Sequence, residues 1–313
     1  MTKQVHVVSH GPHCLDGVTA AVAVARYHTG VAEVVPHFAG NNEIDDVLQS
    51  LTLPAGADLW ITDISWRQPE TDAQLRALAE GGTRIFWIDH HRTALQRFAA
   101  GLVQVPFTDR VLSEEYAASR LVYEYLEKRL AAEKRTVPAF TAFAPIVRMA
   151  DDNDRWLHRV PGSRELAWVV RALGPDAYPE FLALDEHATY TPRMQEARAR
   201  VEAEIAHSFA VANATRVERW VNEVTLVAAM CDGHPSEIAD AWGKETRNAV
   251  FALYDAKSLA VSLRRSPDCT VDLSQVAGAL GGGGHAAAAG CEVPELRRGL
   301  AEALAARVGD VLR

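Results

Sequence analysis

The chain has 313 residues, a formal net charge of −9 and 48% hydrophobic residues. This length suits two domains, and the composition is ordinary for a globular protein. The acidic balance argues against the large basic surface that grips a long nucleic-acid duplex. No apolar stretch approaches the roughly 18 residues that cross a bilayer, and the N-terminus lacks the apolar core of a signal peptide. We therefore expect a cytoplasmic protein without a membrane partner.

The first half of the sequence alternates strand patterns with helical patterns. Short apolar runs predict strands over residues 4–9, 31–38, 58–64 and 84–89. The spacing of apolar residues between them predicts helices over residues 17–28, 42–51 and 68–80. Strands that alternate with helices are typical of βαβ units, so we expect a parallel sheet. Residues 113–181 then have mostly helical patterns.

A second domain is predicted after a long charged segment. Opposite charges lie four residues apart at Glu196 and Arg200, which indicates a solvated connecting helix. Strand patterns return after it, followed by helical patterns over residues 273–280 and from residue 294. The expected boundaries are a first domain over residues 1–190, a connecting helix over 191–215 and a second domain over 216–313.

Polar residues follow three of the predicted strands. His10 and Asp16 come just after the first strand, in the stretch SHGPHCLDG. Asp63 lies near the end of the third strand, and Asp89-His90-His91 ends and follows the fourth. In a parallel sheet, ligands bind at the carboxyl ends of the strands, so these side chains are expected to converge. Three consecutive residues of ligand type favour a metal site over an ordinary polar turn.

The donor types indicate which metal and which reaction to expect. The four cysteines, at positions 14, 231, 269 and 291, form no CxxC pair, which argues against structural zinc. Imidazole and carboxylate donors favour two Mn²⁺ ions, with Mg²⁺, Co²⁺ or Fe²⁺ as alternatives. Two such ions about 3.5–4 Å apart polarise a phosphate and activate water. Phosphoester hydrolysis is therefore the expected reaction class.

Two further motifs bear on the site. The acidic run 151–154 fits a further metal ligand, although by itself an ordinary solvated turn is favoured. The run Gly281–Gly284 followed by His285 predicts a loop whose backbone N–H groups approach an anion. Arg264 and Arg265 can supply a fork of donors for a phosphate. A flexible linker is the alternative for the glycines, but the flanking apolar helix favours a packed loop.

These motifs, in this order, resemble the DHH phosphoesterase superfamily over nearly the whole chain. The first domain contributes SHGPHCLDG, ITD, WIDHH and the acidic run. The second contributes VSLRR and GGGGHAAAAG, which resemble the DHH-associated C-terminal domain of oligoribonucleases, cyclic-dinucleotide phosphodiesterases and RecJ-type exonucleases. The resemblance implies an α/β protein with a parallel-sheet DHH domain, a smaller α/β C-terminal domain and an active site in the cleft between them. It also implies a short oligonucleotide or dinucleotide as substrate, and it leaves a homodimer open.

The resemblance implies a role for each candidate residue. His10 would bind one metal ion, Asp16 the other, Asp63 would bridge them, and His90 would be a further ligand. Asp89 begins the DHH triplet, and we group it with His91, which would face the scissile phosphate, as catalytic. The acidic run would supply the last carboxylate, for which Asp152 is chosen and Asp151 and Asp154 remain open. The residues implied to bind the substrate phosphate are Arg264, Gly282, Gly283, Gly284 and His285.

The first motif departs from the family pattern. Many members have Asp-x-Asp-Gly there, whereas this chain has Cys14 in the place of the first aspartate. Other members have an aspartate just before a cysteine, and here that place holds His13. Either His13 or Cys14 replaces the carboxylate, which favours a softer metal, or the first metal site is weak.

Three alternatives follow from these features. A weak metal site would make the protein a non-catalytic nucleotide or phosphate sensor. A RecJ-like single-strand exonuclease would need an extended basic channel with stacking aromatic residues, which the charge disfavours. A pyrophosphatase or exopolyphosphatase is disfavoured because the C-terminal domain of those enzymes lacks the GGGGH motif.

Overall fold

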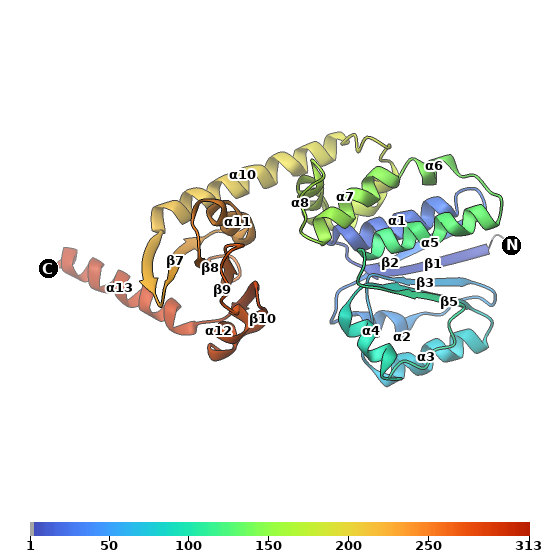
Figure 1. Cartoon of the computed structure of the whole chain (residues 1–313), viewed down its shortest axis with the longest axis horizontal. Helices are drawn as coiled ribbons and strands as arrows, with labels where there is room; N and C mark the ends of the chain where they lie inside the picture. The colour runs from blue at the N-terminus through green and yellow to red at the C-terminus, as the bar shows by residue number, and fades with distance from the viewer. Residues whose placement is uncertain (1–2) are drawn as a thin grey trace. The chain divides into compact units, whose positions relative to one another are not determined.

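A computed structural model of the chain describes residues 3–313, which form two compact units that divide between Ala199 and Arg200 (Figure 1). The first unit contains a parallel sheet and the second a mixed sheet, each with helices packed on it. The predicted fold class, an α/β protein with a smaller α/β C-terminal domain, is therefore confirmed. Within residues 3–313, no helix is both long and apolar enough to cross a membrane.

The first unit is built on five parallel strands. They are β1 (Lys3–His10), β2 (Ala32–Ala39), β3 (Asp58–Thr62), β4 (Arg84–Asp89) and β5 (Asp109–Leu112). Their order across the sheet is β2-β1-β3-β4-β5, and every neighbouring pair is parallel. The chain therefore winds outward from β1 in one direction to β2 and in the other to β3. In such sheets a ligand site is expected at this switch point, beyond the carboxyl ends of β1 and β3.

Helices cover both faces of this sheet (Figure 1). The helices on the face of Trp60 and Phe86 are α1 (Leu15–Tyr27), α5 (Ala118–Ala132), α6 (Pro138–Thr141), α7 (Ala144–Asp154), α8 (Ser163–Leu173) and α9 (Ala177–Leu182), with the 3₁₀ turn η1 (Gly174–Asp176) before α9. Those on the face of Leu59 and Trp87 are α2 (Ile44–Ser50), α3 (Pro69–Glu80) and α4 (Arg92–Ala99). All five residues of β3 are buried, because helices cover both faces of the strand, and its three central residues, Leu59–Ile61, are apolar.

The second unit has a mixed sheet of six strands. Its elements are β6 (Val217–Val221), β7 (Val224–Cys231), α11 (Pro235–Glu245), β8 (Ala249–Asp255), β9 (Ala260–Arg265), α12 (Leu273–Ala279), β10 (Gly283–His285), β11 (Ala288–Cys291) and α13 (Pro294–Leu312). The order is β10-β11-β9-β8-β7-β6, with β7 and β8 parallel and the other neighbours antiparallel. The helix α10 (Pro192–Thr215), at the predicted position of the connecting helix, contributes Met194 to the core of the first unit and Ala212 to that of the second.

Two elements differ from the sequence expectation. The edge strand β5 was not predicted, because it is only four residues long and half of it is exposed, so it has no apolar run. The glycine motif was predicted as a loop. Residues 283–285 instead form strand β10, which pairs with β11 in a hairpin. Glycine has a low intrinsic preference for strands, so the pairing with β11 overrides the local propensity.

A close contact between the end of β1 and the start of α1 holds two of the predicted metal ligands near each other. Gly17 lies in the first turn of α1, and a Cβ atom there would lie 1.9 Å from the carbonyl oxygen of His10. The Ser9 hydroxyl donates a hydrogen bond of 2.7 Å to the carbonyl oxygen of Gly17. Because the helix begins in contact with the strand end, Asp16 and His10 are held near each other.

We predict that Gly17→Ala lowers the free energy of unfolding by about 1–3 kcal/mol, since the new methyl group must displace backbone atoms. Urea denaturation measures the loss. Gly299→Ala is the matched control, because Gly299 lies in the exposed helix α13 and a Cβ atom there would meet no other atom within 4 Å. That variant should be neutral or stabilising by up to about 1 kcal/mol. Equal stability of the Gly17 variant and wild type would contradict the prediction.

Candidate active site

Asp63 occupies the switch point of the parallel sheet. It directly follows β3, its side chain is buried, and its backbone φ of 59° lies in the left-handed region. The Asp63 N–H donates to the carbonyl oxygen of Ile88 at 3.0 Å, which ties the turn to β4. A left-handed aspartate costs free energy, and such conformations concentrate at functional sites.

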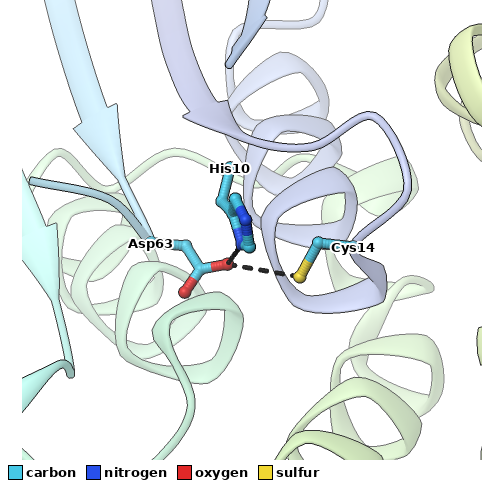
Figure 2. A group of neighbouring side chains, drawn as sticks. All are labelled: His10, Cys14 and Asp63. Atoms are coloured by element: carbon cyan, nitrogen blue, oxygen red, sulfur yellow. Dashed lines mark hydrogen bonds and ion pairs between the residues drawn. The ribbon is translucent and has the colours of Figure 1, made fainter. Parts of the chain in front are cut away.

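One group of donors around Asp63 comes from the end of β1 and the start of α1. The Nδ1 atom of His10 lies 3.7 Å from Asp63 Oδ2, and the Cys14 thiol donates to the same oxygen at 3.5 Å (Figure 2). The three ligand atoms lie within 4.8 Å of one another. Imidazole, thiol and carboxylate are all donors that a transition metal accepts, so the three residues form a candidate metal site.

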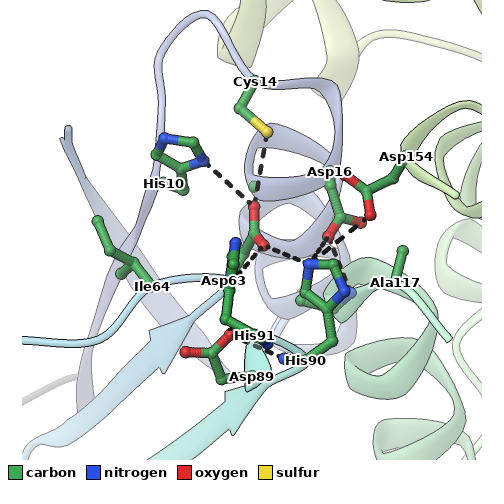
Figure 3. Close-up of polar contacts among 12 residues, drawn as sticks. His10, Cys14, Asp16, Asp63, Ile64, Asp89, His90, His91, Ala117 and Asp154 are labelled. Atoms are coloured by element: carbon green, nitrogen blue, oxygen red, sulfur yellow. Dashed lines mark hydrogen bonds and ion pairs between the residues drawn. The ribbon is translucent and has the colours of Figure 1, made fainter. Parts of the chain in front are cut away.

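A second group lies on the other side of the same carboxylate. The Nε2 atom of His90 is 3.3 Å from Asp63 Oδ1, 3.8 Å from Asp16 Oδ2 and 3.6 Å from Asp154 Oδ2 (Figure 3). The donor atoms of Asp16, His90 and Asp154 also lie within 4.8 Å of one another. Each oxygen of Asp63 therefore faces a different group, which is the arrangement a bridging carboxylate requires.

Asp16 is held in place by a helix N-terminus. Its two carboxylate oxygens accept hydrogen bonds from the backbone N–H groups of Ala118 and Ser119, at 2.8 and 2.9 Å. These residues begin α5, where unpaired N–H groups and the helix dipole favour a negative charge. The N-terminus of α5 thus holds a buried carboxylate of α1 in place, although the two segments lie about 100 residues apart in the sequence.

Asp89 positions the two histidines that follow it. Its Oδ1 atom accepts hydrogen bonds from the N–H groups of His90 and His91, at 2.7 and 3.1 Å, and lies 2.7 Å from Nδ1 of His91. The side chain is completely buried, and among residues 3–313 its Oδ2 atom has no hydrogen-bond partner. The His91 side chain is 44% exposed, so Asp89 orients an imidazole that faces solvent. The hydrogen bond that His91 donates to Asp89 raises the pKa of His91.

The electrostatics of the cluster favour a bound cation. Burial alone would raise the pKa of Asp63, but hydrogen bonds from His10 and His90 and the charge of His91 outweigh it, so the pKa is lowered. Burial would lower the pKa of His90, but Asp63 and the other two carboxylates raise it to about 9. Burial, followed by the charge of Asp63, raises the pKa of Asp16 and of Asp154. The neighbouring carboxylates are thus one cause of the pKa shifts of Asp16, His90 and Asp154, and a cation bound among them would relieve their repulsion.

The residues present fit two divalent ions. The candidate groups together contain three imidazoles, three carboxylates and one thiol, and Asp63 belongs to two of the groups. Oxygen and nitrogen donors suit Mn²⁺, Co²⁺ or Fe²⁺, and the carboxylates also suit Mg²⁺. Bound divalent ions would compensate the surplus of negative charge in the cluster.

Two of the expected metal ligands, Asp152 and His13, lie outside the cluster of donors around Asp63. Asp152, chosen as the last carboxylate, accepts hydrogen bonds from the Arg159 N–H at 2.8 Å and the Ser163 hydroxyl at 2.7 Å. Asp154, which the sequence leaves open, is the member of the acidic run that lies in the cluster. Asp151, the other alternative, binds the Ala117 N–H at 2.9 Å.

His13 also lies outside the cluster. Its Nδ1 atom pairs with the carbonyl oxygen of Arg171 at 3.0 Å, and its ring packs against Gly174. Of the two substitutes for the missing aspartate, the structure brings only Cys14 to Asp63.

A cavity adjoins His91 in the first unit. Its volume is about 540 Å³ and its lining is polar: Asn41, Ser65, Arg67, His91, Thr93, Gln96 and Arg97. The guanidinium group of Arg67 has no hydrogen bond within residues 3–313, whereas that of Arg97 donates to the carbonyl oxygens of Trp66 and Arg67. Apart from His91, the sequence analysis missed these residues, because they belong to no motif and come from three separate segments.

The second unit has a cavity of about 520 Å³ on the face of β9 and β11. Arg264, Gly283, Gly284 and His285, all predicted to bind phosphate, line it. The Arg264 guanidinium donates to the Ser236 hydroxyl at 3.1 Å, near the N-terminus of α11. These groups provide a cation, a helix N-terminus and exposed backbone, which suit an anion.

The expectation for Gly282 needs correction. Its N–H already donates to the carbonyl oxygen of Ala277 at 2.8 Å, and it does not line the cavity. A Cβ atom on Gly282 would lie 2.1 Å from the carbonyl oxygen of Gly290. Glycine is therefore required there by the close approach of the neighbouring strand.

Comparisons with known proteins agree with this architecture. No family model matches the chain. The oligoribonuclease NrnB of Bacillus subtilis (strain 168) is 26% identical over 244 residues, which cover 76% of this chain and 59% of that relative. The solved structure of the pGpG-specific phosphodiesterase PggH from Vibrio cholerae has a TM-score of 0.59 and 14% identity, with 98% of this chain and 99% of that chain covered. The chain is thus similar in sequence to an oligoribonuclease and in fold to a pGpG-specific phosphodiesterase, and both findings agree with the resemblance of its motifs to the DHH superfamily.

Asp154 lies in the candidate metal site, whereas Asp152, two residues earlier, accepts hydrogen bonds from residues outside the site. We predict that Asp154→Asn weakens Mn²⁺ binding at least about tenfold, because ligand charge sets the affinity of such sites. The matched control, Asp152→Asn, should change Mn²⁺ affinity less than about threefold while lowering the free energy of unfolding by about 1–3 kcal/mol. Titration calorimetry and urea denaturation measure the two quantities. The opposite ranking of the two variants in Mn²⁺ affinity would contradict the placement.

Proposed function

We propose that this protein is a divalent-metal-dependent phosphoesterase that hydrolyses dinucleotides or short oligonucleotides. The observation that carries the proposal is the pair of donor groups that share the Asp63 carboxylate at the switch point of the sheet. His10, Cys14 and Asp63 would hold one ion, and Asp16, Asp63, His90 and Asp154 the other. When bound, the two ions would polarise a phosphate and activate a water molecule for in-line attack on phosphorus.

The surrounding residues have distinct roles in this proposal. His91, oriented by Asp89, would donate a hydrogen bond to a phosphoryl oxygen and stabilise the charge that develops there. Arg67, which lines the adjoining cavity with its guanidinium unpaired within residues 3–313, would bind a second phosphate or a terminal one. In the second unit, Arg264 and His285 would bind a phosphate group of a substrate.

The comparisons support a short substrate. The names of the two similar proteins describe an oligoribonuclease and a phosphodiesterase specific for pGpG, a dinucleotide. The net charge of −9 also fits a short ligand better than a long one, because binding of long strands depends on many contacts between basic residues and phosphates. A dinucleotide is therefore the first substrate to test.

The proposal is tested by Mn²⁺-dependent release of mononucleotide from pGpG and from oligonucleotides of increasing length, followed by chromatography. We expect activity that a chelator removes, and faster turnover of the dinucleotide than of long strands. Asp63→Asn should lower the rate at least about 100-fold, since each factor of ten corresponds to only about 1.4 kcal/mol of lost stabilisation. Asparagine tolerates the left-handed backbone as well as aspartate does, so the variant isolates the lost charge. Equal activity of the variant and the wild type would contradict the proposed mechanism. A preference for long strands would instead favour the RecJ-like alternative.

Two adjacent arginines test the role of the second unit. Arg264 lines the cavity, whereas Arg265 donates to the carbonyl oxygen of Val271 at 2.7 Å. We predict that Arg264→Ala raises KM for a dinucleotide about 10- to 100-fold, because a charge-assisted contact with phosphate contributes about 1.5–3 kcal/mol. Arg265→Ala should leave KM within about threefold of wild type. Steady-state kinetics compare the two, and an unchanged KM in the Arg264 variant would refute a phosphate contact.

A further inference from the structure

The two donor groups around Asp63 differ in chemical character. The group of Asp16, His90 and Asp154 offers carboxylates and one imidazole to an ion, together with Asp63. The group of His10 and Cys14 offers an imidazole and a thiol in addition to Asp63, and no second carboxylate. The first of these donor sets is hard, and the second contains a soft sulfur ligand.

The placement of Cys14 has no structural explanation of the usual kind. It is the N-cap residue of α1, yet its side chain makes no capping hydrogen bond. It is partly exposed, whereas Cys231, Cys269 and Cys291 are buried in the apolar clusters of the second unit. Its sulfur atom instead lies 3.5 Å from the buried oxygen of Asp63 that also faces His10 (Figure 2). A cysteine that neither packs in a core nor caps its helix, but joins an imidazole and a carboxylate, is placed as a ligand.

We propose that the candidate dinuclear centre is asymmetric: Cys14 binds one ion as a thiolate, so this position selects a thiophilic ion such as Zn²⁺, Co²⁺ or Fe²⁺. The neighbouring position, with its carboxylates, accepts Mn²⁺ or Mg²⁺. This inference rests on the proposed metal-dependent function. When the ion binds, the sulfur–hydrogen bond gives way to a sulfur–metal bond and the proton passes to solvent. Thiolate and Asp63 together supply two negative charges to the ion, as the two aspartates of the family pattern would.

The test uses the whole protein and reads the metal site without measuring turnover. Wild-type protein loaded with Zn²⁺ should show a sulfur atom at about 2.3 Å in X-ray absorption at the zinc edge. Protein loaded with Co²⁺ should show a sulfur-to-cobalt charge-transfer band in the near ultraviolet. Zinc-loaded wild-type protein without a sulfur neighbour would overturn the proposal.

Two variants separate Cys14 from the three other cysteines. Cys14→Asp and Cys14→Ser should both lose the sulfur signal, and signal that persists in either would overturn the assignment. Cys14→Asp should keep both ions while its preference for Zn²⁺ over Mn²⁺ falls at least about tenfold, because a hard ligand replaces a soft one. Asp154→Asn, which alters the other donor group, should keep the sulfur signal and serves as the control. An unchanged metal preference in Cys14→Asp would also overturn the proposal.

The outcomes distinguish this inference from the proposed function. Wild-type protein that binds two ions and releases mononucleotide from pGpG, but has no metal–sulfur bond, would refute the thiolate ligand and leave the phosphoesterase intact. Protein that binds no divalent ion would refute both. A metal–sulfur bond in a protein that hydrolyses neither pGpG nor the oligonucleotides would uphold the thiolate ligand and refute the proposed reaction.

Discussion

The site depends on one buried carboxylate that two sets of donors share. Asp63 stands where the chain reverses its direction of winding across the sheet, so β1 and α1 deliver His10 and Cys14 to one oxygen while β4 delivers His90 to the other. The left-handed backbone at Asp63 and the burial of its side chain both cost free energy. The three surrounding imidazoles offset that cost by holding the carboxylate ionised. The folded chain thus maintains an arrangement of charge that suits a cation.

Much of the first unit follows from local patterns in the sequence. The strands β1, β3 and β4 are apolar runs that end in polar residues, and in a parallel sheet all such ends meet at one edge. This rule alone brings His10, Asp63 and His90 together without any knowledge of their distances. The sheet order and the parallel pairing were therefore predictable in kind. The strand β5 was not, because an edge strand of four residues has neither an apolar run nor an alternating pattern to reveal it.

The remaining ligands depend on rotation within a helix, which a sequence does not specify. Successive helical residues point about 100° apart, so Asp152 and Asp154, at the end of α7, point to nearly opposite sides of the helix, whereas Asp151 lies three residues before Asp154 and nearer to its face. Packing of α7 against α1 and α5 selects Asp154 and turns Asp152 toward Ser163. The same reasoning separates Cys14 from His13. The N-cap position faces Asp63, whereas the residue before it is in the loop and its ring reaches the end of α8.

In the proposed function, the two units would bind an anion in different ways. The first uses the ends of parallel strands, where side chains from several segments converge on a small volume. The second uses the face of an antiparallel region, where Gly283 and Gly284 pair with β11 and leave backbone and small side chains beside Arg264. Gly282 and Gly284 are needed because a Cβ atom there would lie 2.1 and 2.6 Å from atoms of the neighbouring segment, whereas a Cβ atom at Gly283 would meet nothing within 4 Å. A glycine-rich motif of this kind is therefore explained first by the close approach of the backbone. Its capacity to accept a phosphate would follow from the surface that this packing exposes.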